Sequence, residues 1–201
     1  MANLLDRLAP SATNMIRIDH THALSTFHQY KPRVSHRVKQ GLVSTLCTAL
    51  EIHAQLEEEI FYPAVRSVTD DSLILKSLDE HREMKRLIAT LRRMTPDAMD
   101  YDDTVMALMQ DVLHHVADEE TVVLPQAERL LEGQLGELGV RMTRRRVQLV
   151  APRSGEIAMN MARAATGNKA VLAITALAAL GLLFTGVARP SRGIIQRSSP
   201  R

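Results

Sequence analysis

Four long segments of helical periodicity, each closed by proline or glycine, constrain the fold of this chain more than any other feature. In each segment apolar residues recur at spacings of three and four, the stripe that a helix buries against its neighbours. We predict helices over Thr13–Tyr30, Ser35–Arg66, Asp71–Met94 and Tyr101–Leu131. Asp70 and Asp100 are the expected N-caps of the last two helices. Because the connections are short, consecutive helices run antiparallel, which predicts an up-down-up-down four-helix bundle over residues 12–132.

The composition agrees with an all-α fold class. Apolar residues make up 45% of the 201 residues, enough for a core, whereas aromatic residues make up only 3% and favour no β-sandwich. A formal net charge of +2 does not indicate a nucleic-acid partner, and we expect none. Cys47 stands alone between apolar neighbours, so we interpret it as a small buried side chain in a protein of the reducing cytoplasm.

Histidines and glutamates interrupt all four apolar stripes, and two of the interruptions form a duplicated motif. The second helix carries His53 and Glu57, the fourth carries His115 and Glu119, and both segments follow the pattern H-x3-E-E-x4-P. Residues four apart lie on one face of a helix, so each pair directs two side chains to one place. The proline six residues after each of these glutamates predicts a disturbed helix at the same distance from both pairs.

His20 on the first helix and His81 on the third add one ring nitrogen each to this centre. A carboxylate or imidazolium in an apolar interior is costly unless it is paired or bound to a metal. Imidazole together with carboxylate suits Fe, Mn or Zn better than Ca or Mg, and two carboxylates that can bridge favour two ions. The residues therefore predict a dinuclear site of four histidines and two glutamates.

The motifs IRIDHTH, IHAQLEEEIFYPAV, LDEHREMKRLI and HHVADEETVVLP resemble those of the hemerythrin-like HHE cation-binding domain, over roughly Met15 to Leu131. The resemblance implies a non-haem centre of two iron ions, with Mn or Zn less favoured, and with the two glutamates as bridges. It assigns as ligands His20, His53, Glu57, His81, His115 and Glu119.

The third helix departs from the pattern of oxygen-carrying hemerythrins, which have two histidines four residues apart there. Ser77 and Lys85 occupy those spacings around His81. The departure argues against simple reversible oxygen carriage, because a less filled coordination shell leaves room for water, peroxide or another reactant.

The resemblance implies a centre that binds or reacts with a small diatomic or peroxide ligand, namely peroxide, dioxygen or nitric oxide, including a catalase-like reaction. The alternative is a module that stores or senses iron or dioxygen without turnover, and the sequence does not separate the two. We expect three further glutamates to form a solvated face or an outer support, and four further histidines to lie on the surface. These are Glu58, Glu59 and Glu120, and His22, His28, His36 and His114.

The C-terminal part of the chain has a different character. Residues 133–169 are predicted to form a basic helical segment with an Ala-Pro-Arg-Ser-Gly linker, and residues 170–188 carry no charge. At ~1.5 Å per residue this uncharged stretch spans ~28 Å, close to the bilayer core, and predicts a single transmembrane helix. With no secretory signal at the start, we expect a cytoplasmic bundle anchored to the inner membrane. The alternatives are an alanine-rich amphipathic or buried helix and a soluble cytoplasmic protein, and the oligomeric state is undecided.

Overall fold

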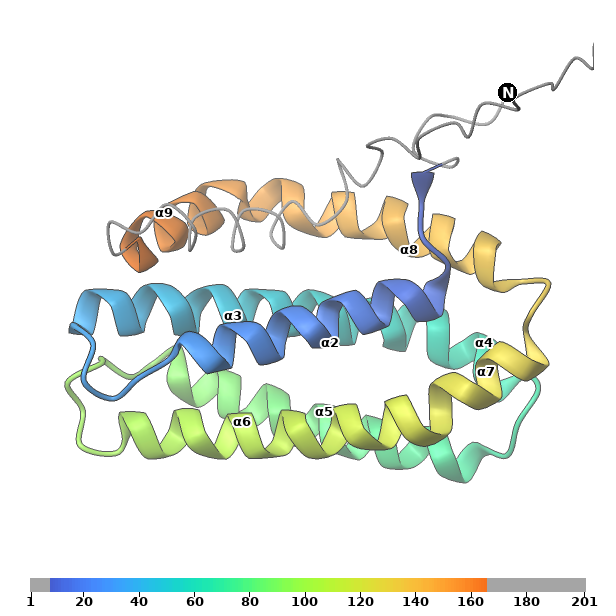
Figure 1. Ribbon diagram of the computed structural model, residues 1–201, viewed down its shortest axis with the longest axis horizontal. Coiled ribbons are helices and arrows are strands. Elements are labelled where there is room, and N and C mark those ends of the chain that lie inside the picture. The colour runs from blue at the N-terminus through green and yellow to red at the C-terminus, as the bar shows by residue number, and fades with distance from the viewer. Residues whose placement is uncertain (1–7, 166–201) are drawn as a thin grey trace, which may run out of the picture.

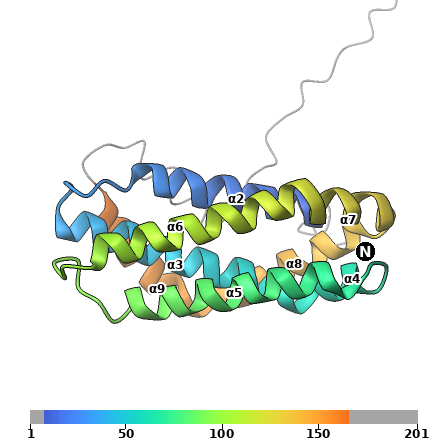
Figure 2. The same cartoon turned by 90° about the horizontal axis from the view of Figure 1, so that it is seen from below.

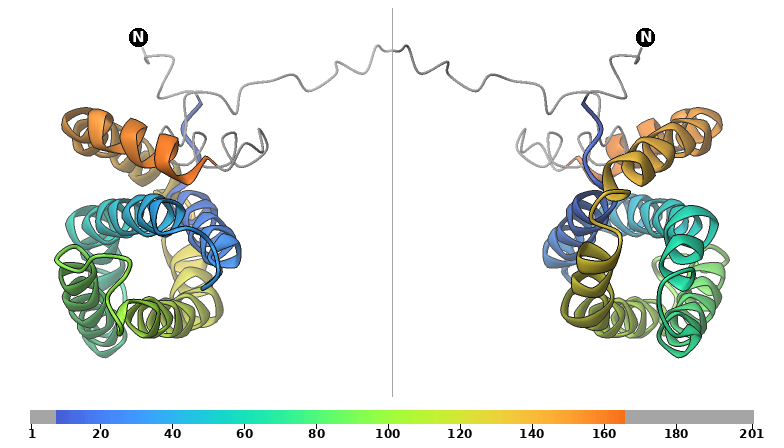
Figure 3. Two further views of the ribbon diagram at one scale, coloured as in Figure 1. Left: turned by 90° about the vertical axis from the view of Figure 1, so that its left-hand side faces the viewer. Right: turned by 90° about the vertical axis from the view of Figure 1, so that its right-hand side faces the viewer.

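The computed structural model describes residues 8–165, and this part of the chain is built from helices around one bundle axis (Figure 1). Seen end-on, the four rods of the bundle lie at the corners of a square (Figure 3). The rods are α2 (Ala12–Gln29), α3 (His36–Leu56) continued by α4 (Tyr62–Arg66), α5 (Asp71–Leu91), and α6 (Tyr101–Asp118) continued by α7 (Leu124–Leu130). This architecture is consistent with the expected helical bundle.

Polar residues begin the helices as the sequence indicates, with one exception. Ser35 and Asp70 accept hydrogen bonds from the backbone N–H groups of Val38 and Ser72, at 3.4 and 2.7 Å. Asp100 occupies the N-cap position of α6 as predicted, but within residues 8–165 its side chain makes no capping hydrogen bond. Its backbone (φ −100°, ψ 7°) lies outside the extended conformation that a capping side chain requires.

Both helices that carry the duplicated motif contain a π-helical turn at the motif. The turn η1 (Glu57–Phe61) joins α3 to α4, and η2 (Glu119–Val123) joins α6 to α7. In η1 the hydrogen bond closes a wider ring than in an α-helix, because the Tyr62 N–H donates to the Glu57 carbonyl. Proline follows immediately and offers no N–H, so the disturbance predicted from its position takes the form of a π-turn.

Two apolar clusters fill the bundle, one toward each end. Leu56 and Phe61 lie in the cluster near α4 and α7, and Leu46 and Leu108 lie in the other. Burial of each such side chain stabilises the fold by about 1.5–3 kcal/mol. Cys47 belongs to the second cluster as expected, and burial raises the pKa of its thiol to about 12. The interrupting histidines and glutamates lie between the clusters, away from water.

Two further helices, α8 (Leu135–Val150) and α9 (Ser154–Ala164), cover the outer side of α2 and α3. Figure 2 shows α5 and α6 side by side along the opposite face. A short 3-10 turn, η3 (Ala151–Arg153), and the start of α9 occupy the stretch expected to be a linker. Helix α9 packs closely on α3 at Gly41, where a Cβ atom would collide with the backbone of Ala164.

Charged pairs tie the helix ends together. Lys39, although buried, donates to both carboxylate oxygens of Asp102 at 2.6 and 2.7 Å, and Tyr30 donates to the same group. At the end of α5, Arg92 donates to Glu51 on α3 at 2.8 Å. These pairs join α2, α3, α5 and α6 at the end of the bundle remote from the π-turns.

The predicted fold class included a transmembrane helix, and in this respect the prediction is wrong. No helix in the described part of the chain is both long enough and apolar enough to cross a bilayer. The physical reason is that each long helix is amphipathic, with a charged face opposite its buried stripe. The segment 170–188, to which the prediction assigned the span, lies outside the described residues.

Candidate metal centre

The six predicted ligands converge at the middle of the bundle, between the two apolar clusters. All are buried, with exposed fractions of 5% or less. Each of the four rods contributes at least one of them: His20 from α2, His53 and Glu57 from α3 and η1, His81 from α5, and His115 and Glu119 from α6 and η2.

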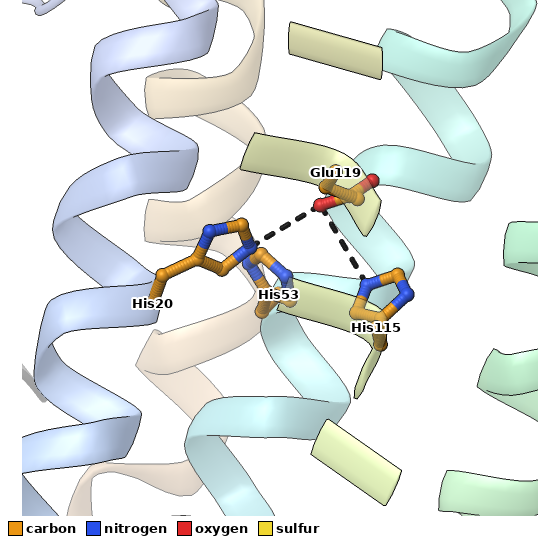
Figure 4. Close-up of side chains that lie close together, drawn as sticks. All are labelled: His20, His53, His115 and Glu119. Atoms are coloured by element: carbon orange, nitrogen blue, oxygen red, sulfur yellow. Dashed lines mark ion pairs between the residues drawn. The ribbon is translucent and has the colours of Figure 1, made fainter. Parts of the chain in front are cut away.

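Glu119 forms one half of the centre with histidines from three helices (Figure 4). The Nε2 atoms of His20 and His115 lie 3.2 and 3.6 Å from Glu119 Oε2. The ring of His53 lies beside that of His20, with ring centres 5.1 Å apart. Three imidazoles therefore surround one carboxylate.

Glu57 forms the other half. Its Oε2 atom lies 3.2 Å from His53 Nε2 and 3.3 Å from His81 Nε2. The two halves meet where His81 Nε2 and His115 Nε2 approach to 3.3 Å. Each glutamate thus faces histidines of its own helix and of a different one.

Two overlapping sets of potential ligand atoms arise from this packing. In each set, the atoms lie within 4.8 Å of one another. One set is His20, His53, His115 and Glu119, and the other is Glu57, His81 and His115. His115 belongs to both sets, so the two sets form one continuous buried cluster.

Several of these inward-facing atoms lie close to one another, yet in the part of the chain that is described their directions do not form hydrogen bonds. They are His20 Nε2, His53 Nε2, Glu57 Oε1 and Glu119 Oε2. Each unsatisfied buried polar group costs about 1–3 kcal/mol, so four at one place are unfavourable unless something binds them. Imidazole nitrogen and carboxylate oxygen are the ligand atoms that Fe, Mn and Zn accept, and these residues therefore fit bound transition metal.

A carboxylate contacts the outward Nδ1 atom of every one of the four histidines. Such partners fix the orientation of a histidine and its tautomer, and they raise its basicity toward a metal. The pairs are His20 with Glu120 (2.9 Å), His53 with Asp19 (3.3 Å), His81 with Glu58 (2.9 Å) and His115 with Glu80 (3.0 Å).

Two of these outer carboxylates were expected and two were missed. Glu58 and Glu120 support the centre, whereas Glu59 pairs with Arg145 at 2.7 Å on the outside. Asp19 and Glu80 each precede a predicted ligand by one position but contact the histidine of another helix. No spacing along a single helix reveals a contact of this kind.

Tyr62 is a further residue at the centre that sequence reasoning did not nominate. Its hydroxyl donates to Glu119 Oε1 at 2.7 Å and lies 3.3 Å from His81 Nε2, and its ring is buried. The π-turn at η1 brings it there, because the wider turn rotates the next residues of the helix. The available signal was its place directly before the motif proline.

The electrostatics separate the two glutamates. Burial and the nearby Glu119 charge raise the pKa of Glu57 well above its ordinary value. Burial also opposes ionisation of Glu119, but its contacts with His20 and His115 outweigh burial and lower its pKa. In turn burial disfavours the charged form of His20, but the Glu119 carboxylate outweighs it and raises the pKa of His20 to about 9. Burial lowers the pKa of His53 to about 4. Without added positive charge, the site therefore disfavours ionisation of both carboxylates at once.

The other histidines lie outside the centre. His28, His36 and His114 are exposed, as expected. His22 differs from the expectation, because it is half-buried and burial lowers its pKa. His114 lies near Glu80 and Asp118 at the surface rather than with the buried ligands.

A four-helix bundle whose core gathers four histidines and two glutamates defines a class of cation-binding bundle proteins. The sequence matches the family model of the hemerythrin HHE cation-binding domain over residues 11–127. The chain belongs to this family.

The chain is also similar to other proteins, at lower identity. A protein named DNA nickase from Nostoc sp. is 28% identical over 132 residues, which cover 66% of this chain but only 38% of the nickase. An uncharacterized protein of Mycobacterium tuberculosis is 25% identical over 118 residues, or 58% of this chain and 72% of that protein. The crystal structure of a hemerythrin HHE cation-binding domain-containing protein from Mycobacterium kansasii has a TM-score of 0.61 at 20% identity, covering 82% of this chain and 99% of that one. The likeness to this crystal structure supports the fold.

Proposed function

We propose that the centre holds two iron ions and that the loaded protein reacts with a small oxidant, either hydrogen peroxide, dioxygen or nitric oxide. The observation that carries the proposal is the group of buried histidine and glutamate atoms that face one another without hydrogen-bond partners among the described residues. Six side chains supply fewer donors than two octahedral ions accept, so a position remains for an added ligand. Manganese and zinc suit the same ligand atoms, so their binding is to be compared with that of iron.

Hydrogen peroxide is the reactant that we favour, in a catalase-like reaction. Two peroxide molecules then yield one dioxygen and two waters, so that one is oxidised and the other reduced. Bound iron would supply the electron transfer, for which the side chains at the centre offer no other carrier. The chain itself holds a proton at the Tyr62 hydroxyl, because burial and the two nearby glutamates raise the pKa of this group well above its ordinary value.

The alternative is a module that stores or senses iron or dioxygen without turnover. It uses the same six ligands, so the two functions differ only in the fate of the bound molecule. A reversible charge-transfer band on exposure of the reduced protein to dioxygen, with no dioxygen released from peroxide, would support this alternative.

The test uses protein loaded with ferrous iron under anaerobic conditions. Added peroxide should release dioxygen from the wild type, and His53→Ala should abolish both the release and the stoichiometric iron. His28→Ala, an exposed histidine on α2, is the matched control and should behave as the wild type. Fully loaded wild type that releases no dioxygen refutes the catalase-like reaction.

A further inference from the structure

A small cavity lies against the candidate metal centre, on the side that α8 and α9 cover. It holds about 40 Å³, and its wall includes the imidazoles of three predicted ligands together with apolar side chains of the bundle. Val150 of α8 and Ile157 of α9 belong to the same wall. The two helices that lie beyond the family match therefore complete a cavity at its centre.

Arg146 of α8 also lines this cavity, and it is almost completely buried. Its Nη1 donates to Asp19 Oδ1 at 2.7 Å, and its Nη2 donates to the other oxygen of the same carboxylate. Its Nε–H is buried and has no hydrogen-bond partner among residues 8–165. The guanidinium is thus anchored at one edge while one donor is left unused, and a buried donor without an acceptor is unfavourable.

The anchor of Arg146 also connects it to the centre. Asp19 accepts from Arg146 and contacts His53 Nδ1 at 3.3 Å. The Nη1 and Nη2 atoms of Arg146 engage both carboxylate oxygens of Asp19, so the position of the guanidinium is fixed. The unused donor therefore has a defined position one side chain away from a predicted ligand.

We propose that this cavity receives the small oxidant and that the Arg146 Nε–H donates a hydrogen bond to the end of that ligand remote from the metals. The assignment rests on the proposed function, because the other end of the ligand must face the metal centre. A cavity needs roughly 10–15 Å³ by this measure to hold one water, so a cavity of about 40 Å³ admits a ligand of two or three non-hydrogen atoms. Because the Arg146 Nε–H is a free donor beside the metal centre, it favours a ligand whose outer end is a hydrogen-bond acceptor or carries a negative charge. Peroxide in its hydroperoxide form meets both conditions, as does the small anion azide.

The test is azide binding to the iron-loaded full chain, followed by the absorption band of azide on ferric iron. Arg146→Met removes the donor and keeps a long side chain, and Arg145→Met, which loses a surface pair with Glu59, is the matched control. We expect azide affinity to fall about tenfold, the ratio that a lost hydrogen bond to a charged group produces. Iron content should not change, and R145M should bind azide as the wild type does.

A second pair of variants leaves Arg146 in place. Ile157→Phe fills the cavity from α9, and Met159→Phe places the same ring at an exposed position of that helix. We expect I157F to weaken azide binding to a similar extent and M159F to have no effect.

The outcomes separate this inference from the proposed function. Equal azide affinity in the wild type, R146M and I157F at full iron content overturns the inference and leaves the two-iron site standing. A loss in R146M with none in I157F also overturns it, because Arg146 would then act by orienting His53 through Asp19. Wild type that holds no iron overturns both.

Discussion

Replacement of Glu57 by leucine should change stability in opposite directions with and without iron. Glu57 is fully buried, its Oε1 has no hydrogen-bond partner in the described chain, and its Oε2 lies 3.2, 3.3 and 3.4 Å from polar atoms of His53, His81 and Tyr62. In the iron-free protein, Glu57→Leu exchanges an unsatisfied carboxyl group for an apolar side chain of similar size. Such exchanges stabilise a fold by about 1–3 kcal/mol. A gain of about 2 kcal/mol raises the Tm of a chain of this length by about 4–8 °C.

With iron present the order should reverse. Ligand binding stabilises the folded state by about 4 kcal/mol when free iron exceeds its Kd a thousandfold, and the variant loses a ligand and with it most of this stabilisation. Thermal unfolding followed by circular dichroism, with and without iron, measures both effects. Glu83→Leu, on the exposed face of α5, is the control and should not alter the response to iron. Iron-free E57L that is less stable than the iron-free wild type would refute the reasoning.

Three further changes have expected outcomes. Glu80→Ala should lower iron affinity 10- to 100-fold with little loss of helix content, as measured by competition with a chelator, and unchanged affinity would contradict the role of the outer carboxylates. Gly41→Ala should destabilise the protein by about 1–3 kcal/mol and expose α9 amides to hydrogen exchange, whereas Gly155→Ala, which has open space around it, should be neutral or stabilising. Burial opposes ionisation of Asp102, but hydrogen bonds from Lys39 outweigh it and lower the pKa. The pair therefore contributes fully above about pH 4, the ordinary carboxyl pKa, and its contribution is lost as pH falls through the lowered value. Denaturant titrations of the wild type and Asp102→Asn should converge in acid, and a constant difference down to low pH would contradict this.

Much of the bundle and of the centre could be predicted because both depend on the spacing of residues along single helices. Helical periodicity marks the four rods, and a histidine and a glutamate four residues apart share a face in any helix. His53 and Glu57, like His115 and Glu119, lie where that argument puts them. To predict that the charge-bearing side chains of the four helices are buried at the same level, only the antiparallel topology was needed in addition.

The remainder depends on contacts between helices, which spacing does not encode. Asp19 and Glu80 contact histidines of other rods, and Tyr62, which directly follows a π-turn, contacts Glu119 of another rod. Arg146 belongs to a basic run that is ordinarily solvated, yet the packing of α8 buries it. The membrane-spanning helix was predicted for residues 170–188, which lie outside the described residues, and no helix in the described part of the chain could cross a bilayer.

The central claim is that cations compensate the polar side chains that face inward on all four rods. Elemental analysis of protein purified without chelator, together with X-ray absorption at the iron edge, tests it most directly. We predict two transition-metal ions per chain, with a first shell of imidazole nitrogen and carboxylate oxygen that is lost when Glu57 and Glu119 are both changed to leucine. A wild-type chain that carries no stoichiometric transition metal, even after iron is supplied during expression, would contradict the claim.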